Sequence, residues 1–344
     1  MNTTPRTVIG IDGARFTRNG VPTHAGRRFR GRDISGLLFN ARMANAIVDD
    51  RNQSTRGVWA YADGPWDPAR NTHEFALALP LYRRHGLDAV TINLQGGSPQ
   101  GYSWNQPWNL SGFAADGTPL ADTLGRLDHV LEAADNAGVA VILGLFYGWA
   151  ARRLVNEAAV LRALDAAIAH VMAGGWRNVL IEIGNEVDNR SFTHDIIRPP
   201  RCVELIRRVR EATWGRLKVS TSLNGGAIPA DAVIAACDFV LLHGNNVEEP
   251  ARIGAMVAAV RASPAYRGQP ILFNEDDHYR FDAAENNFAT AIEAGAGWGY
   301  FDYRRIREGF AEGYQSLPVD WGINSARKRG FFRLLADITG NVPP

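Results

Sequence analysis

The fold is decided by an apolar run that ends in an acidic residue, Asn178-Val179-Leu180-Ile181-Glu182-Ile183-Gly184-Asn185-Glu186. A second run of the same kind is Pro270-Ile271-Leu272-Phe273-Asn274-Glu275. Neither run alternates cleanly between apolar and polar residues, which is typical of strands that are buried on both faces. In a parallel barrel, the C-terminal ends of such strands carry the functional side chains. The two runs therefore predict buried parallel strands with a glutamate at one shared rim.

Strand and helix patterns alternate along the rest of the chain. The eight expected strands are residues 27–34, 87–94, 138–146, 178–185, 217–223, 237–243, 269–274 and 296–302. Helical spacing of apolar residues occurs at 120–137, 157–173, 202–214, 251–262, 283–294 and 326–338. This alternation predicts an α/β chain that forms a single (β/α)8 TIM barrel over residues 1–344. A doubly wound sheet, the alternative, would need a phosphate-binding loop after its first strand, and Arg30-Gly31-Arg32-Asp33 is not such a loop.

Two kinds of addition to the barrel are expected. The dipeptides Asp12-Gly13 and Asn19-Gly20 are hairpin signals, so a short β-hairpin layer is expected at about residues 7–26. Two long connections follow the first and second expected strands, at 40–71 and 96–117. Connections of this length are either functional loops or surface insertions.

The composition limits the class of partner and the compartment. The net charge is +1 and 46% of the residues are hydrophobic, which gives no reason to expect nucleic acid or an anionic membrane as a partner. No apolar run is long enough to span a membrane, and Met1 to Gly10 lack a signal-peptide pattern. The cysteines Cys202 and Cys237 have no metal-binding spacing. We expect a soluble protein without a cofactor, cytoplasmic as the sequence stands, or secreted if a leader has been removed.

The two glutamates indicate a chemistry. Alternate residues of a strand share one side, so Glu186, Gly184 and Glu182 are expected to face the barrel interior. Glu275 ends the seventh strand, and rim positions on the fourth and seventh strands can meet over the barrel axis. Retaining hydrolysis of a glycosidic bond needs two carboxyl groups about 5–5.5 Å apart, one as general acid and then base, the other as nucleophile. The pair therefore predicts a glycoside hydrolase.

These features resemble clan A of the retaining glycoside hydrolases, whose best-known members are the cellulase-like enzymes of family 5. The resemblance rests on a strand that ends in Asn185-Glu186 and on a second glutamate, Glu275, at the end of a later strand. It implies that Glu186 is the acid/base, that Asn185 contacts the sugar 2-hydroxyl, and that Glu275 is the nucleophile. Glu182, four residues before the acid/base, also matches a common clan position, and the N-terminal hairpin matches a plug at the bottom of the barrel.

Three departures from family 5 mark the chain as an atypical member. The arginine that usually ends strand two is missing from Thr91-Ile92-Asn93-Leu94-Gln95, and Arg30 or Arg32 is considered as its substitute. Strand six ends in His243-Gly244-Asn245 instead of His-x-Tyr. The usual tryptophan at the end of strand eight is replaced by an earlier one, Trp298.

The expected partner is a carbohydrate: an oligosaccharide, a polysaccharide or a smaller glycoside. Aromatic rings after strands can pack against the C–H faces of sugars, while amides and histidine can bind hydroxyls. The expected substrate-binding residues are Asn185, His243, Asn245, Asn93, Tyr147, Trp149, Trp104 and Trp298. The sequence does not predict the sugar, the linkage or the oligomeric state.

Two alternatives remain open at this point. Asp276-Asp277-His278, together with Glu275, His243 and Glu186, contains the ligand types of a divalent metal site. Such a site would suit a metal-dependent sugar isomerase or epimerase. The other alternative is a barrel that binds carbohydrate without turning it over. We expect no metal, because adjacent strand residues point in opposite directions and Asp276 should therefore face away from Glu275.

Overall fold

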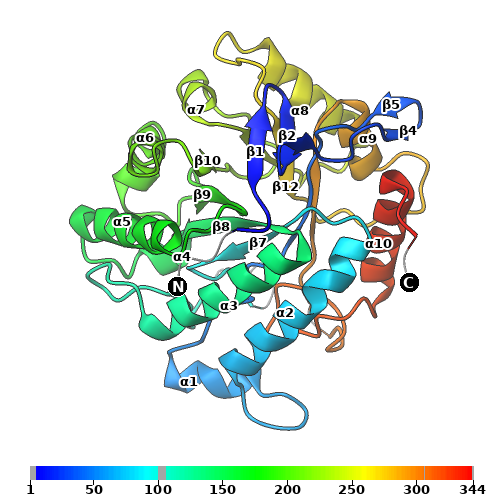
Figure 1. The fold of residues 1–344 in the computed structure, drawn as a ribbon. Coiled ribbons are helices and arrows are strands. Elements are labelled where there is room, and N and C mark those ends of the chain that lie inside the picture. The colour runs from blue at the N-terminus through cyan, green and yellow to red at the C-terminus, as the bar shows by residue number, and fades with distance from the viewer. Residues whose placement is uncertain (1–4, 100–105, 306, 343–344) are drawn as a thin grey trace.

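Eight parallel strands surrounded by helices form the centre of the computed structural model, which describes residues 5–99, 106–305 and 307–342 (Figure 1). The strands are β6 (Phe39–Arg42), β7 (Ala89–Asn93), β8 (Ala140–Tyr147), β9 (Val179–Asn185), β10 (Lys218–Ser220), β11 (Val240–His243), β12 (Ile271–Glu275) and β13 (Trp298–Phe301). The helices that follow them in turn are α2 (Pro68–Arg84), α3 (Ala121–Ala137), α5 (Glu157–Ala173), α6 (Cys202–Ala212), α7 (Asp231–Ala236), α8 (Pro250–Ala262), α9 (Asn287–Glu293) and α10 (Ala326–Thr339). The chain is thus a (β/α)8 TIM barrel, as the sequence predicts.

The strands close into a barrel in chain order. Six of them form one sheet in the order β10-β9-β8-β7-β6-β13, and β11 pairs with β12 in parallel. Parallel bridges from Leu272 to Gly297 and from Asp276 to Tyr300 join β12 to β13. The amide of Asp238, just before β11, donates to Val219 O of β10 at 2.9 Å. All eight strands therefore point the same way, and their carboxyl ends share one rim.

The first barrel strand lies later in the chain than the sequence analysis predicts. Residues 27–34 do not enter the barrel, because Arg30 and Gly31 adopt positive φ angles of 47° and 78° and turn the chain back on itself. The result is a small antiparallel pair, β4 (Arg28–Phe29) and β5 (Arg32–Asp33). The barrel strand is instead β6, which is buried throughout. This correction places Arg42, which was expected in a connection, at the carboxyl-terminal rim of the barrel.

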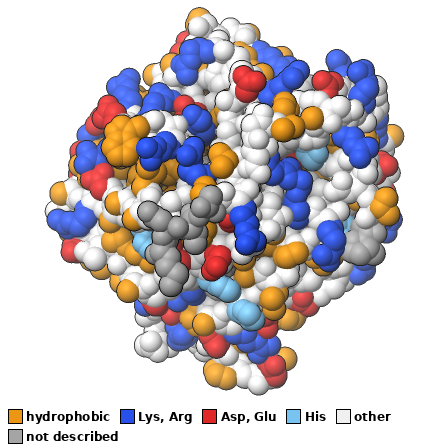
Figure 2. Space-filling model, in the orientation of Figure 1, with side chains coloured by type: hydrophobic (Ala, Val, Ile, Leu, Met, Phe, Trp, Pro, Cys, Tyr) orange, Lys and Arg blue, Asp and Glu red, His pale blue; other side chains and the backbone are white. Residues whose placement is uncertain are grey.

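A three-stranded meander covers the amino-terminal end of the barrel. It consists of β1 (Ile9–Asp12), β2 (Arg15–Arg18) and β3 (Val21–Pro22), and it confirms the expected hairpin layer. Ile9 and Phe16 are buried in one cluster with residues of the barrel interior, among them Leu38 and Leu180. Figure 2 shows this face of the molecule, on which Lys and Arg side chains are spread among acidic and neutral ones.

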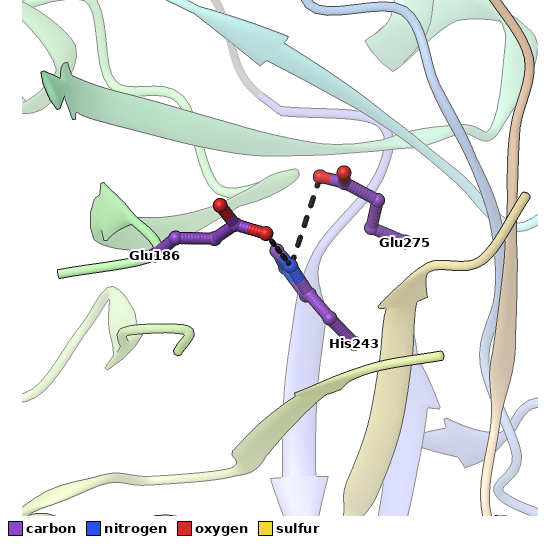
Figure 3. Close-up of side chains that lie close together, drawn as sticks. All are labelled: Glu186, His243 and Glu275. Carbon is purple, nitrogen blue, oxygen red and sulfur yellow. Dashed lines mark hydrogen bonds and ion pairs between the residues drawn. The ribbon is translucent and has the colours of Figure 1, made fainter. Parts of the chain in front are cut away.

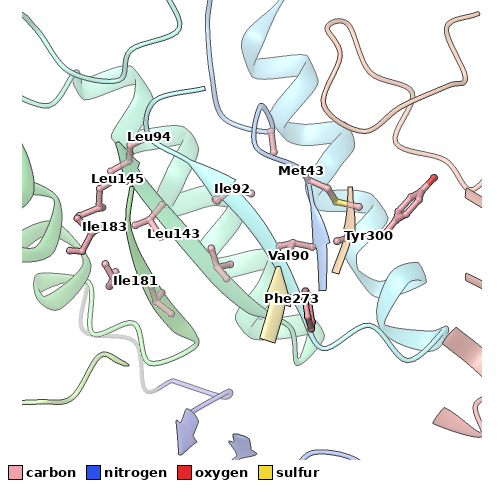
Figure 4. Packing of buried hydrophobic residues seen from close by; sticks show 14 of the residues in the cluster. Met43, Val90, Ile92, Leu94, Leu143, Leu145, Ile181, Ile183, Phe273 and Tyr300 are labelled. Carbon is pink, nitrogen blue, oxygen red and sulfur yellow. The ribbon is translucent and has the colours of Figure 1, made fainter. Parts of the chain in front are cut away.

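The main core lies between the strands and the ring of helices (Figure 4). On β9, Ile181 and Ile183 belong to this core, whereas Leu180 packs inside the barrel with the hairpin. Burial of each such side chain contributes roughly 1.5–3 kcal/mol before entropy is subtracted. Because Leu180 faces the barrel interior, the alternation of side chains along β9 also turns Glu182 inward, as expected.

The remaining elements are short. They are α1 (Gln53–Arg56), η1 (Gly57–Trp59), α4 (Gly148–Ala151) and η2 (Asp195–Ile197). The sequence patterns do not predict α2 and α7, and the other six helices begin within four residues of the expected positions. In the part of the chain that the structure describes, no helix is both long enough and apolar enough to cross a lipid bilayer.

Candidate active site

A cavity of about 310 Å³ lies at the carboxyl ends of the barrel strands. Strands β6, β9 and β12 end at it with Arg42, Glu186 just after β9, and Glu275. Among the described residues that line it, these three carry the charged side chains. Amide side chains line much of the rest, namely Gln106, Asn185, Asn189, Asn224, Asn245, Asn246 and Gln315.

Glu186 and Glu275 approach one another from different strands, and the side chain of His243 lies between them (Figure 3). One carboxylate oxygen of each glutamate and a ring nitrogen of His243 all lie within 4.8 Å of one another. The nearest carboxylate oxygens of the two glutamates are therefore no more than 4.8 Å apart, which is compatible with the carboxyl separation of about 5–5.5 Å that retaining hydrolysis needs. The structure therefore brings the predicted pair together across the barrel mouth.

One oxygen of Glu275 forms an ion pair, and the other accepts a hydrogen bond. Arg42 Nε lies 2.8 Å from Oε2, and Asn245 Nδ2 donates to Oε1 at 2.7 Å. Burial lowers the pKa of Arg42, but the carboxylates of Glu275 and Glu182 raise it by more, so the guanidinium stays charged. These contacts fix the orientation of the Glu275 carboxylate and place a positive charge beside it.

Glu186 has a different environment. Burial raises the pKa of its carboxyl group, the charge of Glu275 raises it further, and the hydrogen bond from His243 opposes the rise without cancelling it. His243 Nδ1 lies 3.2 Å from Oε1, and Asn189 Nδ2 donates to Oε2 at 3.5 Å. A carboxyl group with a raised pKa can be protonated near neutral pH, which is what a general acid requires.

His243 connects the two carboxylates. Its Nδ1 lies 3.2 Å from Glu186 and 3.8 Å from Glu275. Burial lowers the pKa of the imidazole, but the charge of Glu275 and the hydrogen bond to Glu186 raise it by more. A donor at this position stabilises negative charge on both glutamates.

The other expected residues divide into those that line the cavity and those that do not. Asn185, Tyr147, Trp149 and Asn245 line it. The guanidinium of Arg152 covers the Trp149 ring at 4.4 Å from its centroid, and this contact holds the indole in place. Trp104 lies outside the described residues.

Three of the expected binding residues do not line the cavity, namely His243, Trp298 and Asn93. His243 is fully buried between the two glutamates. Trp298 is fully buried at the start of β13, four residues before the rim residue Asp302. Its ring stacks on Phe288 at 4.7 Å and its Nε1 donates to Asp276 at 2.9 Å, so it supports the fold instead of a sugar. Asn93 is also fully buried. Its side-chain amide is oriented so that the nitrogen donates to the Ile92 carbonyl and the oxygen accepts from Arg42 Nη2 at 3.3 Å. Asn93 therefore supports the arginine.

Several residues of the cavity are not predicted from the sequence. Arg42 could have been found, because Leu37-Leu38-Phe39-Asn40-Ala41 before it is an apolar run of the same kind as those before the glutamates. Asn189 and Asn224 lie in loops, where the sequence has no periodicity that would place them. The substitutes considered for the missing arginine, Arg30 and Arg32, are at the β4–β5 turn on the outside of the barrel.

The geometry does not suit a divalent cation at either acidic cluster. At Glu186, His243 and Glu275, the guanidinium of Arg42 already supplies positive charge 2.8 Å from Glu275. At Asp276, Asp277 and His278, both oxygens of Asp276 already accept hydrogen bonds, from His278 on one side and from Trp298 and Asn287 on the other. These contacts fit an internal hydrogen-bond network better than a metal site.

Comparisons with known proteins agree with this fold. No family model matches the sequence, and no curated protein matches it. Among solved structures, the endo-1,4-beta-mannanase from Rhizomucor miehei aligns over 97% of this chain and 100% of its own, with a TM-score of 0.60 and 13% identity. A glycoside hydrolase family 5 mannosidase from the same organism aligns over 97% of each chain, with a TM-score of 0.56 and 12% identity. A GH5-4 broad specificity endoglucanase from Bacteroides salanitronis covers 89% of this chain and 94% of its own, with a TM-score of 0.56 and 12% identity. At these identities the likeness establishes a shared barrel fold.

Proposed function

We propose that this protein is a retaining glycoside hydrolase that uses Glu275 as nucleophile and Glu186 as acid/base. The observation that carries the proposal is the approach of the two carboxylates to within 4.8 Å over the barrel mouth. The two carboxyl groups have different surroundings, as the roles of nucleophile and acid/base require. Glu275 is held by Arg42 and Asn245, whereas burial and the nearby Glu275 raise the pKa of Glu186.

The reaction has two steps in this scheme. In the first step, Glu275 Oε attacks the anomeric carbon while Glu186 donates its proton to the glycosidic oxygen, so that the leaving group departs neutral. In the second step, Glu186 takes a proton from water, which attacks the same carbon and releases Glu275. The two inversions give a product of retained configuration.

The lining of the cavity favours a neutral sugar. Besides the three charged groups that form the Arg42–Glu275–Glu186 arrangement, the polar side chains are mainly amides, which both donate and accept hydrogen bonds. Hydroxyl groups have the same dual character, whereas an acidic sugar would need further cations for its carboxylate. Trp149 adds an apolar surface for a ring face.

The names of the structural neighbours suggest where to look first. They include mannanases, mannosidases and an endoglucanase. We therefore propose β-linked manno- and gluco-oligosaccharides as the first substrates to test. Aryl glycosides of the same sugars provide a sensitive parallel assay.

The stereochemistry of the product tests the mechanism. NMR of the first-formed sugar should show the anomeric configuration of the substrate. An inverted first product would contradict the two-step scheme. Binding of oligosaccharides without any turnover would instead favour the barrel that only binds carbohydrate.

A further inference from the structure

The hydroxyl of Ser222 links Glu186 to a second buried glutamate beneath it. Ser222 Oγ donates to Glu182 Oε1 at 2.6 Å. The backbone amide of Glu186 donates to the same Oγ at 3.1 Å. Both Ser222 and Glu182 are fully buried. One hydroxyl, two residues beyond the end of β10, therefore contacts the backbone of the proposed acid/base.

The direction of these bonds follows from the groups involved. A serine hydroxyl has one proton to donate, and its oxygen can accept two hydrogen bonds. The carboxylate of Glu182 takes the proton, which leaves the oxygen lone pairs for the amide of Glu186. Glu182 also lies 3.9 Å from Arg42 Nη1. It thus connects Ser222 to the arginine that contacts Glu275.

The backbone of Glu186 needs such support. Its φ angle is 56°, in the left-handed region that residues other than glycine rarely adopt. Such conformations persist where the surroundings enforce them, and they cluster at functional sites. Ser222 meets both peptide groups around this position, because its backbone carbonyl also accepts from the amide of Val187 at 3.0 Å. The Glu186 side chain now points toward Glu275 (Figure 3). A negative φ angle at Glu186 would turn it away from that direction.

We propose that Ser222 is a positioning residue for the acid/base, which holds the Glu186 backbone in its left-handed conformation through a hydroxyl oriented by Glu182. This inference rests on the proposed function of Glu186. Ser222 does not line the cavity, so it acts on the proton-transfer step through Glu186 and not by contact with substrate.

The dependence of the rate on the leaving group tests this role. A general acid matters most when the leaving group is a poor one, and its help is worth about 10²–10⁴-fold in total. Two aryl glycosides of one sugar are compared, one with a strongly acidic phenol and one with a weakly acidic phenol. The measured quantity is the kcat/KM for the strongly acidic phenol divided by the kcat/KM for the weakly acidic phenol. This ratio does not depend on the fraction of folded enzyme, because that fraction affects both substrates equally.

Ser222→Ala should raise this ratio by at least about fivefold, as part of the general-acid contribution is lost. The matched control is Ser220→Ala, which removes a fully buried hydroxyl two residues earlier that lies next to Cys237 instead of Glu186. Its ratio should stay at the wild-type value. Ser222→Cys keeps the shape with a weaker donor and should give an intermediate ratio, which serves if Ser222→Ala does not fold.

The outcomes separate this inference from the proposed function. If the wild type hydrolyses both substrates with retention but Ser222→Ala and Ser222→Cys lower both rates equally, Ser222 is merely structural and the inference is wrong. A wild type that hydrolyses no glycoside contradicts the proposed function itself, and the role of Ser222 with it. A kcat/KM ratio that rises in Ser222→Ala and stays at the wild-type value in Ser220→Ala supports both.

Discussion

Arg42 and Glu275 form an ion pair with 2.8 Å between Nε and Oε2, although they lie far apart in the sequence. The closure of the barrel explains the contact. Arg42 ends β6 and Glu275 ends β12, and the two strands are separated only by β13, which pairs with β6 and is bridged to β12. Both side chains are almost completely buried. The pair therefore joins the first and last parts of the barrel at the rim.

Replacement of Arg42 should damage both activity and stability. Arg42→Met would leave the Glu275 carboxylate buried without its cation, which costs about 3–5 kcal/mol of unfolding free energy for a buried pair. The loss of a preorganised charge at the reacting group should lower kcat/KM roughly 10²–10³-fold. Urea unfolding and kinetics with an aryl glycoside measure the two effects. Arg208→Met, which removes a half-exposed cation on α6, should change neither by much.

Local sequence patterns place the two glutamates at the rim of the barrel but do not place Arg42 there. Glu186 and Glu275 follow long apolar runs with no competing strand signal nearby. Arg42 follows a similar run, but the strand-like residues at 27–34 compete with it, and only the turn at Arg30-Gly31 excludes them from the barrel. Local pattern does not distinguish a surface hairpin from a barrel strand, since burial depends on tertiary packing.

The other differences between the expected and the observed site residues have related causes. The sequence correctly places Trp298 on the last strand, but whether a side chain of that strand reaches the rim depends on where the strand ends, and this must be known to within a residue or two. Asn189 and Asn224 are brought to the cavity by loops after β9 and β10, whose course depends on contacts such as Asn189 Nδ2 to Asn224 Oδ1 at 3.0 Å. Loop contacts of this kind leave no periodic signal.

Removal of the proposed nucleophile should abolish turnover. Glu275→Gln keeps the size of the side chain but cannot form the glycosyl–enzyme bond, so activity should fall roughly 10⁴-fold or more. Circular dichroism and thermal melting should show that the barrel remains folded. Glu248→Gln, at a glutamate whose side chain is 84% exposed, is the matched control and should be fully active. Near-normal activity of Glu275→Gln would rule out the assignment.

The hairpin that closes the other end of the barrel should be sensitive to Asp88. This buried carboxylate contacts Arg18 at 2.9 Å and His24 at 2.6 Å, both on the hairpin segment. Asp88→Asn should therefore lower the unfolding free energy by roughly 1.5–3 kcal/mol, the range for hydrogen bonds to charged groups. Asp12→Asn, at an exposed position of the same hairpin, should have little effect. Equal stabilities of the two variants would contradict this role.

The same contact predicts a dependence of stability on pH. Burial raises the pKa of Asp88, but His24, Arg83 and Arg18 lower it by more, so the folded-state pKa lies below the ordinary value. A depressed carboxyl pKa stabilises the fold above the unfolded-state pKa of about 3.9, and this stability is lost as the pH falls through the folded-state value. Urea unfolding of the wild type should therefore lose more stability below about pH 4 than that of Asp88→Asn.

The raised pKa of Glu186 predicts the basic side of the activity profile. A general acid must be protonated for the first step, so kcat/KM should fall as the pH rises through the pKa of Glu186, which burial and Glu275 place above its ordinary value. The profile of Glu186→Ala should lack this fall when it is measured with an aryl glycoside whose leaving group needs little protonation. A basic side that is unchanged in Glu186→Ala would assign it to another group, of which His243 is the nearest.

Glu186→Ala also allows the two steps to be separated chemically. With a strongly acidic phenol as leaving group, the first step needs little help and should proceed, whereas the second step lacks its general base. The glycosyl–enzyme on Glu275 should then accumulate as a burst of phenol, followed by turnover slowed about 10²–10⁴-fold. Azide is a nucleophile that needs no base, so its addition should restore turnover and give a glycosyl azide with the configuration of the substrate. Mass spectrometry of the accumulated species should place the sugar on the peptide that contains Glu275. A sugar found on another residue would overturn the assignment of the nucleophile, and a burst that azide does not relieve would remove Glu186 from the role of base.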